Sequence, residues 1–247
     1  VRAMQTVQVG MPEYALEAEL LYVMQKYGCK TAYNSIVGGG KNACILHYVE
    51  NNQPLNDGDL VLIDAGAELN HYAADITRTF PVNGRFSEPQ AALYQLVLDA
   101  QLAAIEVMRV GQHCKAYHEV AVRVLTEGLV RLGLLTGEPA ELIESGAYRR
   151  FYMHGTGHWL GMDVHDVGSY KDAAGEQWRP LQAGMVLTVE PGLYVATDDV
   201  TVDAKWRGIG IRIEDDILIT AGEPEVLTAG VPKSIAAIEQ LMQRSVA

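Results

Sequence analysis

Two aspartates placed symmetrically about one predicted β-hairpin constrain this chain more than any other feature. Residues 60–63 (LVLI) and 76–80 (ITRTF) have the composition of strands, and the short polar turn between them is centred near residues 69–70. If the strands pair about that turn, Asp64 and Asp75 lie opposite each other. Directly opposed side chains have Cβ atoms only ~5 Å apart, and like charges there are destabilising. Something must therefore offset the repulsion.

Three interpretations of this pair remain open on the hairpin alone. The two carboxyl groups could share a proton, they could bind a divalent cation, or they could lie loosely on a solvated turn. A divalent cation offsets two neighbouring negative charges better than a shared proton does at neutral pH. The rest of the chain has to decide between these interpretations.

A second segment repeats the pattern of the hairpin in the other half of the chain. The run DGDLVLIDAG aligns with AGMVLTVEPG, so that Asp64 corresponds to Glu190. Another acidic strand follows in each half, with Asp75 in the first and Glu214 in the second. Four carboxylates carry four negative charges, which two divalent cations would balance. The repeat predicts a duplicated strand pair with a two-metal site.

The segment MHGTGHWLGMDVHDVG supplies three histidines, His154, His158 and His165. His154 and His158 have the spacing of the zinc ligands in an HExxH helix. The glutamate is absent, however, and two glycines separate the histidines, so we do not expect a helix. Glycines there would instead allow close approach of the backbone. Carboxylates with one imidazole suit Mn²⁺, Co²⁺, Zn²⁺ or Fe²⁺.

Five motifs of this chain together resemble the signatures of aminopeptidase P. They are, in chain order, VLIDAG, DITRTFPVNG, HGTGHWLGMDVHDVG, VLTVEPGLYV and RGIGIRIEDD. Aminopeptidase P belongs with prolidase, creatinase and methionine aminopeptidase. The resemblance implies the α+β pita-bread fold, in which duplicated α/β halves surround a curved antiparallel sheet. It also implies a metal-dependent Xaa-Pro aminopeptidase, a hydrolase whose substrate is a peptide with proline at the second position.

Carried over position by position, the resemblance assigns five metal ligands. They are Asp64, Asp75, His158, Glu190 and Glu214. Asp75 and Glu214 would bridge two divalent ions, with Asp64 on one ion and His158 and Glu190 on the other. The implied ions are Mn²⁺ in the first place, with Co²⁺, Zn²⁺ and Fe²⁺ as alternatives.

The resemblance also implies roles beside the metals. The substrate-binding residues would be His47, His154, His165, Tyr194 and Arg212. Glu190 would carry a proton to the leaving nitrogen, and His154 and His165 would donate hydrogen bonds to the tetrahedral oxyanion or the flanking carbonyl. The strand pattern supports Arg212 independently, because alternation in IGIRIE directs it to the same side as Glu214.

The resemblance implies a single metallopeptidase domain over residues 1–247, and composition fits a cytoplasmic enzyme. At 247 residues and 49% hydrophobic content, the chain can bury one sizeable core. Its formal net charge of −12 argues against nucleic acid as a partner. No apolar run approaches the length of a membrane span, so we expect no membrane partner. The three cysteines are scattered, as is typical of reduced thiols.

Helical patterns cover residues 12–27, 87–108 and 115–132, and Ser87 begins the second with a capping-box pattern. We expect a tight loop at residues 38–41. Histidines without a motif are predicted to lie at the surface, and the large aromatic residues either in the core or along the cleft. These residues are His71, His113, His118, Trp159 and Trp206.

The chain begins VRAMQ, whereas aminopeptidases P and prolidases usually carry a separate N-terminal domain. We therefore expect residues 1–10 to be the remnant of an interdomain helix, with that domain absent here, and the full-length protein could be a homo-oligomer. Three alternatives stay open. Prolidase would use the same ligands on dipeptides, and methionine aminopeptidase can be a single domain of this size. A pita-bread module that binds a protein partner would not be an enzyme.

Overall fold

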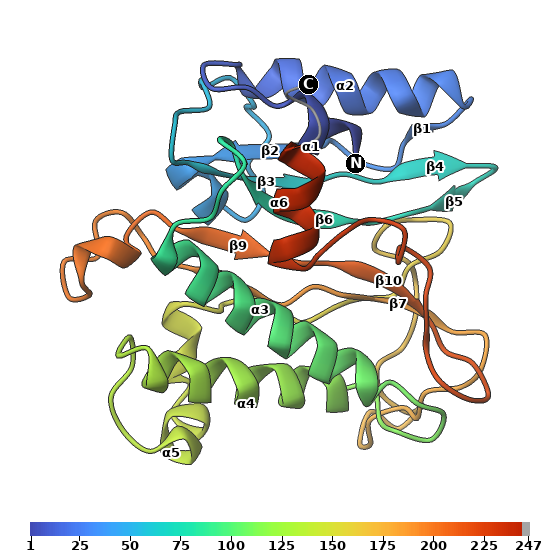
Figure 1. Ribbon diagram of the computed structural model, residues 1–247. Helices are drawn as coiled ribbons and strands as arrows, with labels where there is room; N and C mark the ends of the chain where they lie inside the picture. Colours follow the sequence, from blue (N-terminus) through green and yellow to red (C-terminus); the bar gives the residue numbers. More distant parts are fainter. Residues whose placement is uncertain (244–247) are drawn as a thin grey trace.

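The strands of the computed structural model form two equivalent hairpins, one in each half of the chain (Figure 1). The structure describes residues 1–243. The strands of the first half are β1 (Lys30–Thr31), β2 (Ile36–Gly39), β3 (Leu60–Asp64), β4 (Ala67–Leu69), β5 (Tyr72–Ala73) and β6 (Thr77–Pro81). Those of the second half are β7 (Val186–Val189), β8 (Gly192–Tyr194), β9 (Gly210–Arg212), β10 (Asp215–Leu218) and β11 (Glu225–Val226). The predicted duplication appears as β3 with β6 and β7 with β10.

The three predicted helices are confirmed, each to within about two residues at its ends. The α-helices of the described residues are α1 (Arg2–Thr6), α2 (Glu13–Lys26), α3 (Glu88–Glu106), α4 (Ala116–Arg131), α5 (Pro139–Glu144) and α6 (Ile235–Gln243). Short 3₁₀ turns are η1 (Gly40–Cys44), η2 (Ala147–Arg150) and η3 (Ala204–Trp206). Ser87 and Gln90 form the predicted capping box at the start of α3. The expected loop at residues 38–41 is the end of β2 followed by η1.

The first hairpin differs from the prediction in its register. β3 pairs with β6 so that Asp64 lies opposite Thr77. The turn is centred on Asn70 and His71, one residue later than predicted, and both have left-handed backbones with φ of 52° and 64°. Moving the centre of a hairpin by one residue shifts its register by two. The prediction that Asp64 and Asp75 are directly opposed is therefore wrong, and the two are diagonal neighbours.

The second hairpin contains the directly opposed carboxylates instead. β7 pairs with β10, with Val189 opposite Asp215, and β8 pairs with β9 in the same register. At the break between these two ladders, the register brings Glu190 opposite Glu214. The repulsion inferred for the first hairpin thus applies to the second.

Strands β6 and β9 bring the two halves together at the level of these acidic residues. The Glu214 N–H donates to the Thr77 carbonyl at 3.0 Å, and Thr79 Oγ1 donates to the Arg212 carbonyl at 2.9 Å. In Figure 1, α3 and α4 lie side by side against the second half, and α2 runs along the opposite edge beyond β2 and β3. The acidic ends of both hairpins therefore meet in the middle of the fold.

Apolar residues on the opposite side of β9 pack into the core beneath α3. Ile211 and Ile213 are both 0% exposed and join the largest buried cluster, while Arg212 faces the cleft described below. The predicted alternation along IGIRIE is confirmed. Trp159 and Trp206 are 9% and 6% exposed and pack in two different apolar clusters, as large aromatic residues usually do.

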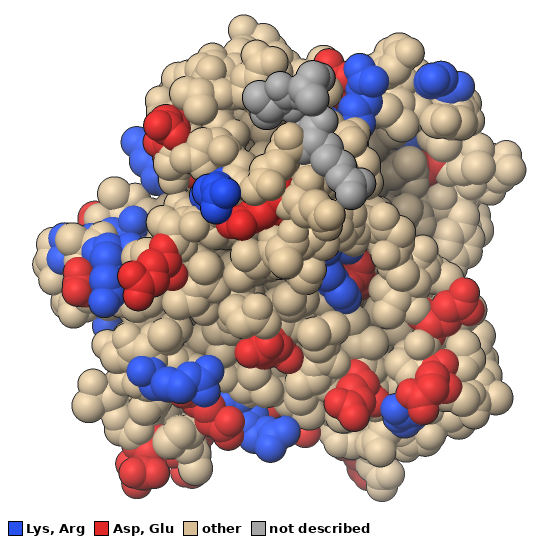
Figure 2. Space-filling model, viewed as in Figure 1, with Lys and Arg blue, Asp and Glu red and all other residues tan. Residues whose placement is uncertain are grey.

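Within the described residues, no helix is long and apolar enough to span a membrane. Cys29 and Cys44 are half-buried and Cys114 is buried, and none of the three forms a disulfide in this part of the chain. On the face shown in Figure 2, acidic and basic side chains lie next to one another over α4 and around η3. The acidic excess is not gathered into one patch on that face.

Candidate metal and catalytic site

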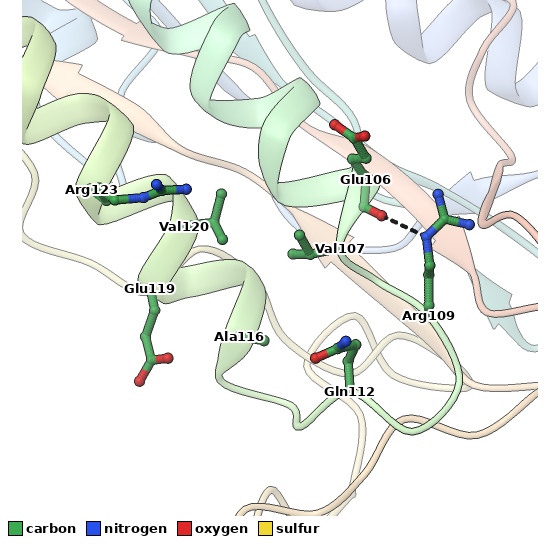
Figure 3. Close-up of a pocket in the computed structure, with 8 residues that line it drawn as sticks. All are labelled: Glu106, Val107, Arg109, Gln112, Ala116, Glu119, Val120 and Arg123. Carbon is green, nitrogen blue, oxygen red and sulfur yellow. Dashed lines mark hydrogen bonds between the residues drawn. The ribbon is translucent and has the colours of Figure 1, made fainter.

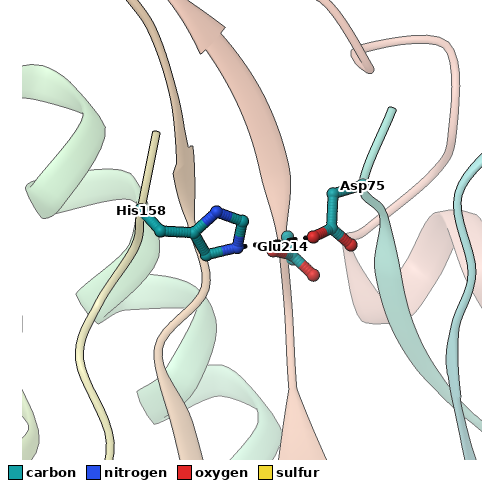
Figure 4. Close-up of side chains that lie close together, drawn as sticks. All are labelled: Asp75, His158 and Glu214. Atoms are coloured by element: carbon teal, nitrogen blue, oxygen red, sulfur yellow. Dashed lines mark ion pairs between the residues drawn. The ribbon is translucent and has the colours of Figure 1, made fainter. Parts of the chain in front are cut away.

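Three potential metal ligands from distant parts of the chain converge between the two hairpins (Figure 4). Asp75 lies just before β6, His158 lies in the irregular segment before β7, and Glu214 lies between β9 and β10. Each offers one ligand atom, and these atoms all lie within 4.8 Å of one another. The Nε2 atom of His158 is 3.4 Å from Asp75 Oδ2. The three side chains are arranged as the ligands of one small ion would be.

The other two predicted ligands lie against this trio. Glu190 Oε1 is 3.6 Å from His158 Nε2. Asp64 is linked to Asp75 through Tyr33, whose hydroxyl contacts Asp64 Oδ1 at 2.5 Å and also hydrogen-bonds Asp75 Oδ1. The fold therefore brings together all five residues that the resemblance assigned to the metals.

The buried side chain of Arg212 connects these carboxylates. Its Nη2 atom donates to Asp64 Oδ2 at 2.6 Å, and its Nε atom donates to Thr77 Oγ1 at 3.3 Å. Thr77 in turn donates to Glu214 Oε2 at 2.6 Å. Partners of this kind orient metal-binding carboxylates and limit their charge repulsion. A single guanidinium thus binds Asp64 of the first half directly and connects to Glu214 of the second half through Thr77.

The histidine segment runs alongside β7 and hydrogen-bonds to it as an additional strand would. This close contact explains why the segment contains glycines. Thr188 N–H donates to the His158 carbonyl at 2.9 Å, and Glu190 N–H donates to the Thr156 carbonyl at 2.7 Å. A Cβ atom on Gly157 would lie 1.9 Å from the Thr188 carbonyl oxygen. Only glycine allows this close approach. The prediction that the segment is not a helix is confirmed.

The ring of His158 is oriented for a metal. Its Nδ1 atom lies 3.0 Å from the Trp159 carbonyl, so Nδ1 carries the proton and donates, leaving Nε2 directed at Asp75. Burial alone would lower the pKa of His158, but the contact with Asp75 and the charge of Glu190 outweigh it and raise that pKa to about 8. The imidazole is therefore surrounded by negative charge.

The negative charge of the acidic side chains exceeds the positive charge of the groups around them. Burial raises the pKa of Glu190 to about 7, against the opposing charge of Arg212. Burial also raises the pKa of Asp64, and burial with the charge of Asp75 raises that of Glu214 well above its ordinary value. Groups in this condition either hold protons or bind cations. Divalent cations fit a set of oxygen donors with one imidazole.

A cleft of about 280 Å³ opens over these ligands. Its lining includes three further histidines that the resemblance assigned to the substrate, His47, His154 and His165. The ring of His165 stands edge-on to that of His158, with centroids 4.3 Å apart. Tyr194 is 2% exposed and lies behind His154, which its hydroxyl contacts at 2.8 Å. The structure brings Tyr194 to the site as a neighbour of His154 rather than as part of the cleft wall.

The chemistry does not lie in a larger hollow elsewhere on the surface. A hollow of about 580 Å³ lies between the end of α3 and the start of α4 (Figure 3). Its lining combines Val107 and Val120 with Glu119 and Arg123, and it contains no histidine or cysteine. The smaller cleft is where histidines and carboxylates converge.

Two site residues were missed by sequence reasoning. His118 was predicted to lie at the surface, but it is half-buried and its Nδ1 atom lies 2.8 Å from Thr156 Oγ1, so that prediction is wrong. Tyr33, which contacts Asp64 and Asp75, lies in no recognised motif. Both act across long sequence separations, and no local pattern marks them. The side chain of His71 is 84% exposed, as predicted. That of His113 is 44% exposed, although its Nδ1 atom is buried.

The duplicated hairpins, with the potential metal ligands between them, define a protein of the pita-bread class. The model of metallopeptidase family M24 matches residues 1–221, and the chain belongs to that family. The resemblance to aminopeptidase P and the predicted fold are both confirmed. Membership in this family also supports the binding of divalent metal.

Curated relatives and solved structures give the same result. The chain is 54% identical to the Xaa-Pro aminopeptidase of Haemophilus influenzae, covering 98% of this chain and 56% of that protein. It is 51% identical to the Xaa-Pro aminopeptidase of Escherichia coli, covering 98% and 54%. Aminopeptidase PepP of Pseudomonas aeruginosa superposes with a TM-score of 0.97 at 58% identity, covering 99% of this chain and 55% of that one.

A further solved structure is described as zinc-substituted E. coli aminopeptidase P in complex with product. It superposes with a TM-score of 0.95 at 50% identity, covering 99% of this chain and 55% of that one. The chain spans about half the length of the curated relatives it matches.

Proposed function

We propose that the protein is a dinuclear-metal aminopeptidase that hydrolyses the bond between an N-terminal residue and a following proline. One observation carries the proposal: five side chains that could bind metal converge beside a cleft lined by His47, His154 and His165. The names of the relatives support the proline specificity. The cysteines form no disulfide within residues 1–243, which fits the cytoplasm as the compartment.

The five side chains would hold two divalent ions. Asp75 and Glu214 would be shared between the ions, Asp64 would bind one of them, and His158 and Glu190 would bind the other. Mn²⁺ is the first candidate for this donor set, with Co²⁺, Zn²⁺ and Fe²⁺ as alternatives. When bound, such ions would activate the attacking water and polarise the scissile carbonyl.

Glu190 would move the proton from the attacking water to the leaving nitrogen. It lines the cleft, and its two oxygens face His158 and His154 at 3.6 Å and 3.9 Å. A proton carrier works best with a pKa near the working pH. Burial raises the pKa of Glu190 to about 7, which suits a group that first accepts and then donates.

His154 and His165 would act as neutral donors to the oxyanion or the flanking carbonyl. Burial, with the charge of Arg212, lowers the pKa of His154 to about 3. Burial and the neighbouring His158 also lower the pKa of His165. A neutral imidazole keeps one N–H to donate without adding a charge that would repel metal ions. His47 would contact the proline ring from the other wall of the cleft.

The test is a metal-reconstitution assay on a short peptide panel. Protein stripped with a chelator is loaded with each of the four ions, and bound metal per chain is measured together with hydrolysis of Ala-Pro, Ala-Pro-Ala, Ala-Ala-Ala and Met-Ala-Ala. We expect two ions per chain and preferential cleavage of Ala-Pro-Ala. Cleavage of Ala-Pro alone would identify a prolidase, and cleavage of Met-Ala-Ala a methionine aminopeptidase. A protein without metal or hydrolysis would be a binding module.

A further inference from the structure

Glu13 is a buried carboxylate that no part of the metal site uses. It is the first residue of α2, it is 0% exposed, and both of its oxygens accept two hydrogen bonds. Oε1 accepts from the Gly39 N–H at 2.8 Å and from Asn42 Nδ2 at 3.0 Å. Oε2 accepts from the Tyr48 hydroxyl at 2.8 Å and from the Gln53 N–H at 2.9 Å. All four partners are donors, so each carboxylate oxygen has two hydrogen-bond partners.

The four partners of Glu13 all lie in the segment that carries His47. Gly39 and Gln53 stand at the two ends of this segment, residues 39–53. Asn42 and Tyr48 enclose its inner part, and Tyr48 directly follows His47. Glu13 therefore fastens the segment at both ends and again on either side of the cleft residue.

This segment has little regular structure of its own. Beyond η1, residues 45–53 belong to no helix or strand, so side-chain contacts determine their conformation. Tyr48 is 5% exposed and packs with Ile36, Leu62 and Tyr194, which places its ring against the core. His47, one residue earlier, is exposed and lines the cleft with Leu46. A shift of Tyr48 would therefore move His47.

We propose that Glu13 is a positioning residue for the proline-binding wall of the cleft: it holds residues 39–53 so that His47 faces the metal ligands. This inference rests on the proposed function, because it assigns that wall to the residue after the scissile bond. Glu13 does not touch substrate and acts through Tyr48 and Asn42. Its loss should weaken binding of proline more than it affects the metals.

The substitution Glu13→Gln tests the proposal with almost no change in shape. An amide replaces one acceptor oxygen by a donor, which then faces groups that are donors themselves. Glu19→Gln is the matched control, because Glu19 lies on the same helix and pairs with Arg2 away from the cleft. Tyr48→Phe is a milder second variant, and it serves if Glu13→Gln does not fold. It removes one of the four donors to Glu13, together with the hydrogen bond that the Tyr48 hydroxyl accepts from Asn42 Nδ2.

Three measurements on the protein as its gene encodes it separate positioning from general stability. They are metal content after loading with Mn²⁺, kcat and KM for Ala-Pro-Ala and Ala-Ala-Ala, and hydrogen–deuterium exchange of peptides covering residues 39–53. For Glu13→Gln we expect unchanged metal content and faster exchange in that segment. The kcat/KM for Ala-Pro-Ala should fall roughly tenfold to a hundredfold, mainly through a higher KM, since a misplacement of ~1 Å can cost ~10²-fold in rate. The kcat/KM for Ala-Ala-Ala should fall less. Tyr48→Phe should change exchange and kcat/KM in the same direction as Glu13→Gln, and Glu19→Gln should change neither.

Faster exchange with an unchanged ratio of the two specificity constants would overturn the positioning role, because Glu13 would then support only the fold. Unchanged exchange would overturn it as well. If the unsubstituted protein cleaves neither peptide, the proposed function fails, and the exchange data still decide whether Glu13 orders residues 39–53.

Discussion

Arg212 Nη1 lies 3.0 Å from the hydroxyl oxygen of Tyr194, and this contact sets the direction of a hydrogen-bond chain that ends in the cleft. A guanidinium can only donate, so Tyr194 accepts from Arg212 and has its own proton free for His154 Nε2 at 2.8 Å. The single proton of neutral His154 then sits on Nδ1, which lies 2.7 Å from the Gly155 carbonyl and 3.9 Å from Glu190 Oε2. A substrate oxygen could take the place of that carbonyl.

Tyr194→Phe should therefore slow catalysis without releasing metal. The substitution leaves the ring in place but removes the donor to His154 Nε2, so the imidazole can adopt the other tautomer and direct a lone pair at the substrate. Losing one donor to an oxyanion costs ~10²–10³-fold in rate, and we expect a fall of about tenfold or more in kcat. The measurement is steady-state kinetics with metal analysis.

Tyr148→Phe is the control for this substitution. Tyr148 belongs to the same aromatic row, with ring centroids 6.5 Å from Tyr152, which in turn packs 4.9 Å from His154. Its hydroxyl is not part of the chain from Arg212. If Tyr194→Phe lost as much metal as His158→Ala, the tautomer argument would be wrong.

Asp75→Asn should remove metal and activity together. The amide keeps the shape of the side chain but loses its charge and one oxygen donor, at the point where Asp75 faces His158 at 3.4 Å. Changing a partner of a metal ligand typically costs ~10–100-fold in affinity or activity, and a ligand itself should cost more. The check is metal per chain by elemental analysis, alongside hydrolysis of Ala-Pro-Ala.

His154→Ala is the informative comparison for Asp75→Asn. We expect it to keep its metal while kcat/KM falls by ~10²–10³-fold, as is typical for the loss of one oxyanion donor. Near-normal turnover and full metal content in Asp75→Asn would refute the two-metal assignment.

The sequence predicted which acidic residues come together but not their exact pairing. The sequence predicts the turn one residue too early because LNHY has no glycine to mark its centre. Asparagine and histidine, which form the centre, both adopt left-handed backbones more readily than most residues. This shift of one residue changes the partner opposite Asp64 from Asp75 to Thr77. The repeated pattern places acidic residues at equivalent strand ends whatever the register, so the cluster of carboxylates does not depend on the position of the turn.

Two of the residues that support the site, Tyr33 and His118, carry no signal in the sequence. Tyr33 reaches Asp75 across 42 positions, and His118 reaches Thr156 across 38. Neither has a periodicity or spacing that sets it apart. Such contacts arise when packed elements meet, so they become visible only in the folded chain.

The metal-free protein should lose stability as the pH rises from about 4.5 to about 7. Burial raises the pKa of Glu190 from 4.5 to about 7, so the folded state binds this proton more tightly than the unfolded chain does. Stability from such a group is complete below its unfolded pKa and disappears as pH passes its folded pKa. The pKa of His158, raised to about 8, changes stability in the same direction, and so do the raised pKa values of Asp64 and Glu214. The pKa of His154, lowered to about 3, acts in the opposite direction and offsets part of the effect.

Urea denaturation with a chelator, at about pH 5 and about pH 7.5, measures this effect. The Glu190 shift alone corresponds to ~3 kcal/mol as an upper bound. Saturating Mn²⁺ should reverse the trend, because metal replaces the protons and binds better as the ligands deprotonate. Glu190→Gln should reduce the pH dependence in chelator. A metal-free protein that is more stable at the higher pH would contradict the electrostatic account of the site.

The last prediction concerns His118, which joins α4 to the histidine segment. Its Nδ1 atom lies 2.8 Å from Thr156 Oγ1, which also lies 2.5 Å from the Tyr152 hydroxyl. Burial lowers the pKa of His118, so the ring is neutral and Nδ1 can accept the Thr156 proton while Tyr152 donates to Thr156. The Thr156 carbonyl in turn accepts the Glu190 N–H at 2.7 Å. His118 thus supports the backbone of a metal ligand from outside the cleft.

His118→Leu should lower metal affinity and kcat/KM by roughly tenfold, in the range found for partners that orient metal ligands. His118→Asn should recover most of the loss, because its amide can present an acceptor where Nδ1 lies. The free energy of unfolding should change by only ~1 kcal/mol, the value of one ordinary hydrogen bond. Metal titration, kinetics and urea denaturation of both variants provide the check. Equal defects in the leucine and asparagine variants would mean that the imidazole ring fills space and that its hydrogen bond to Thr156 does not matter.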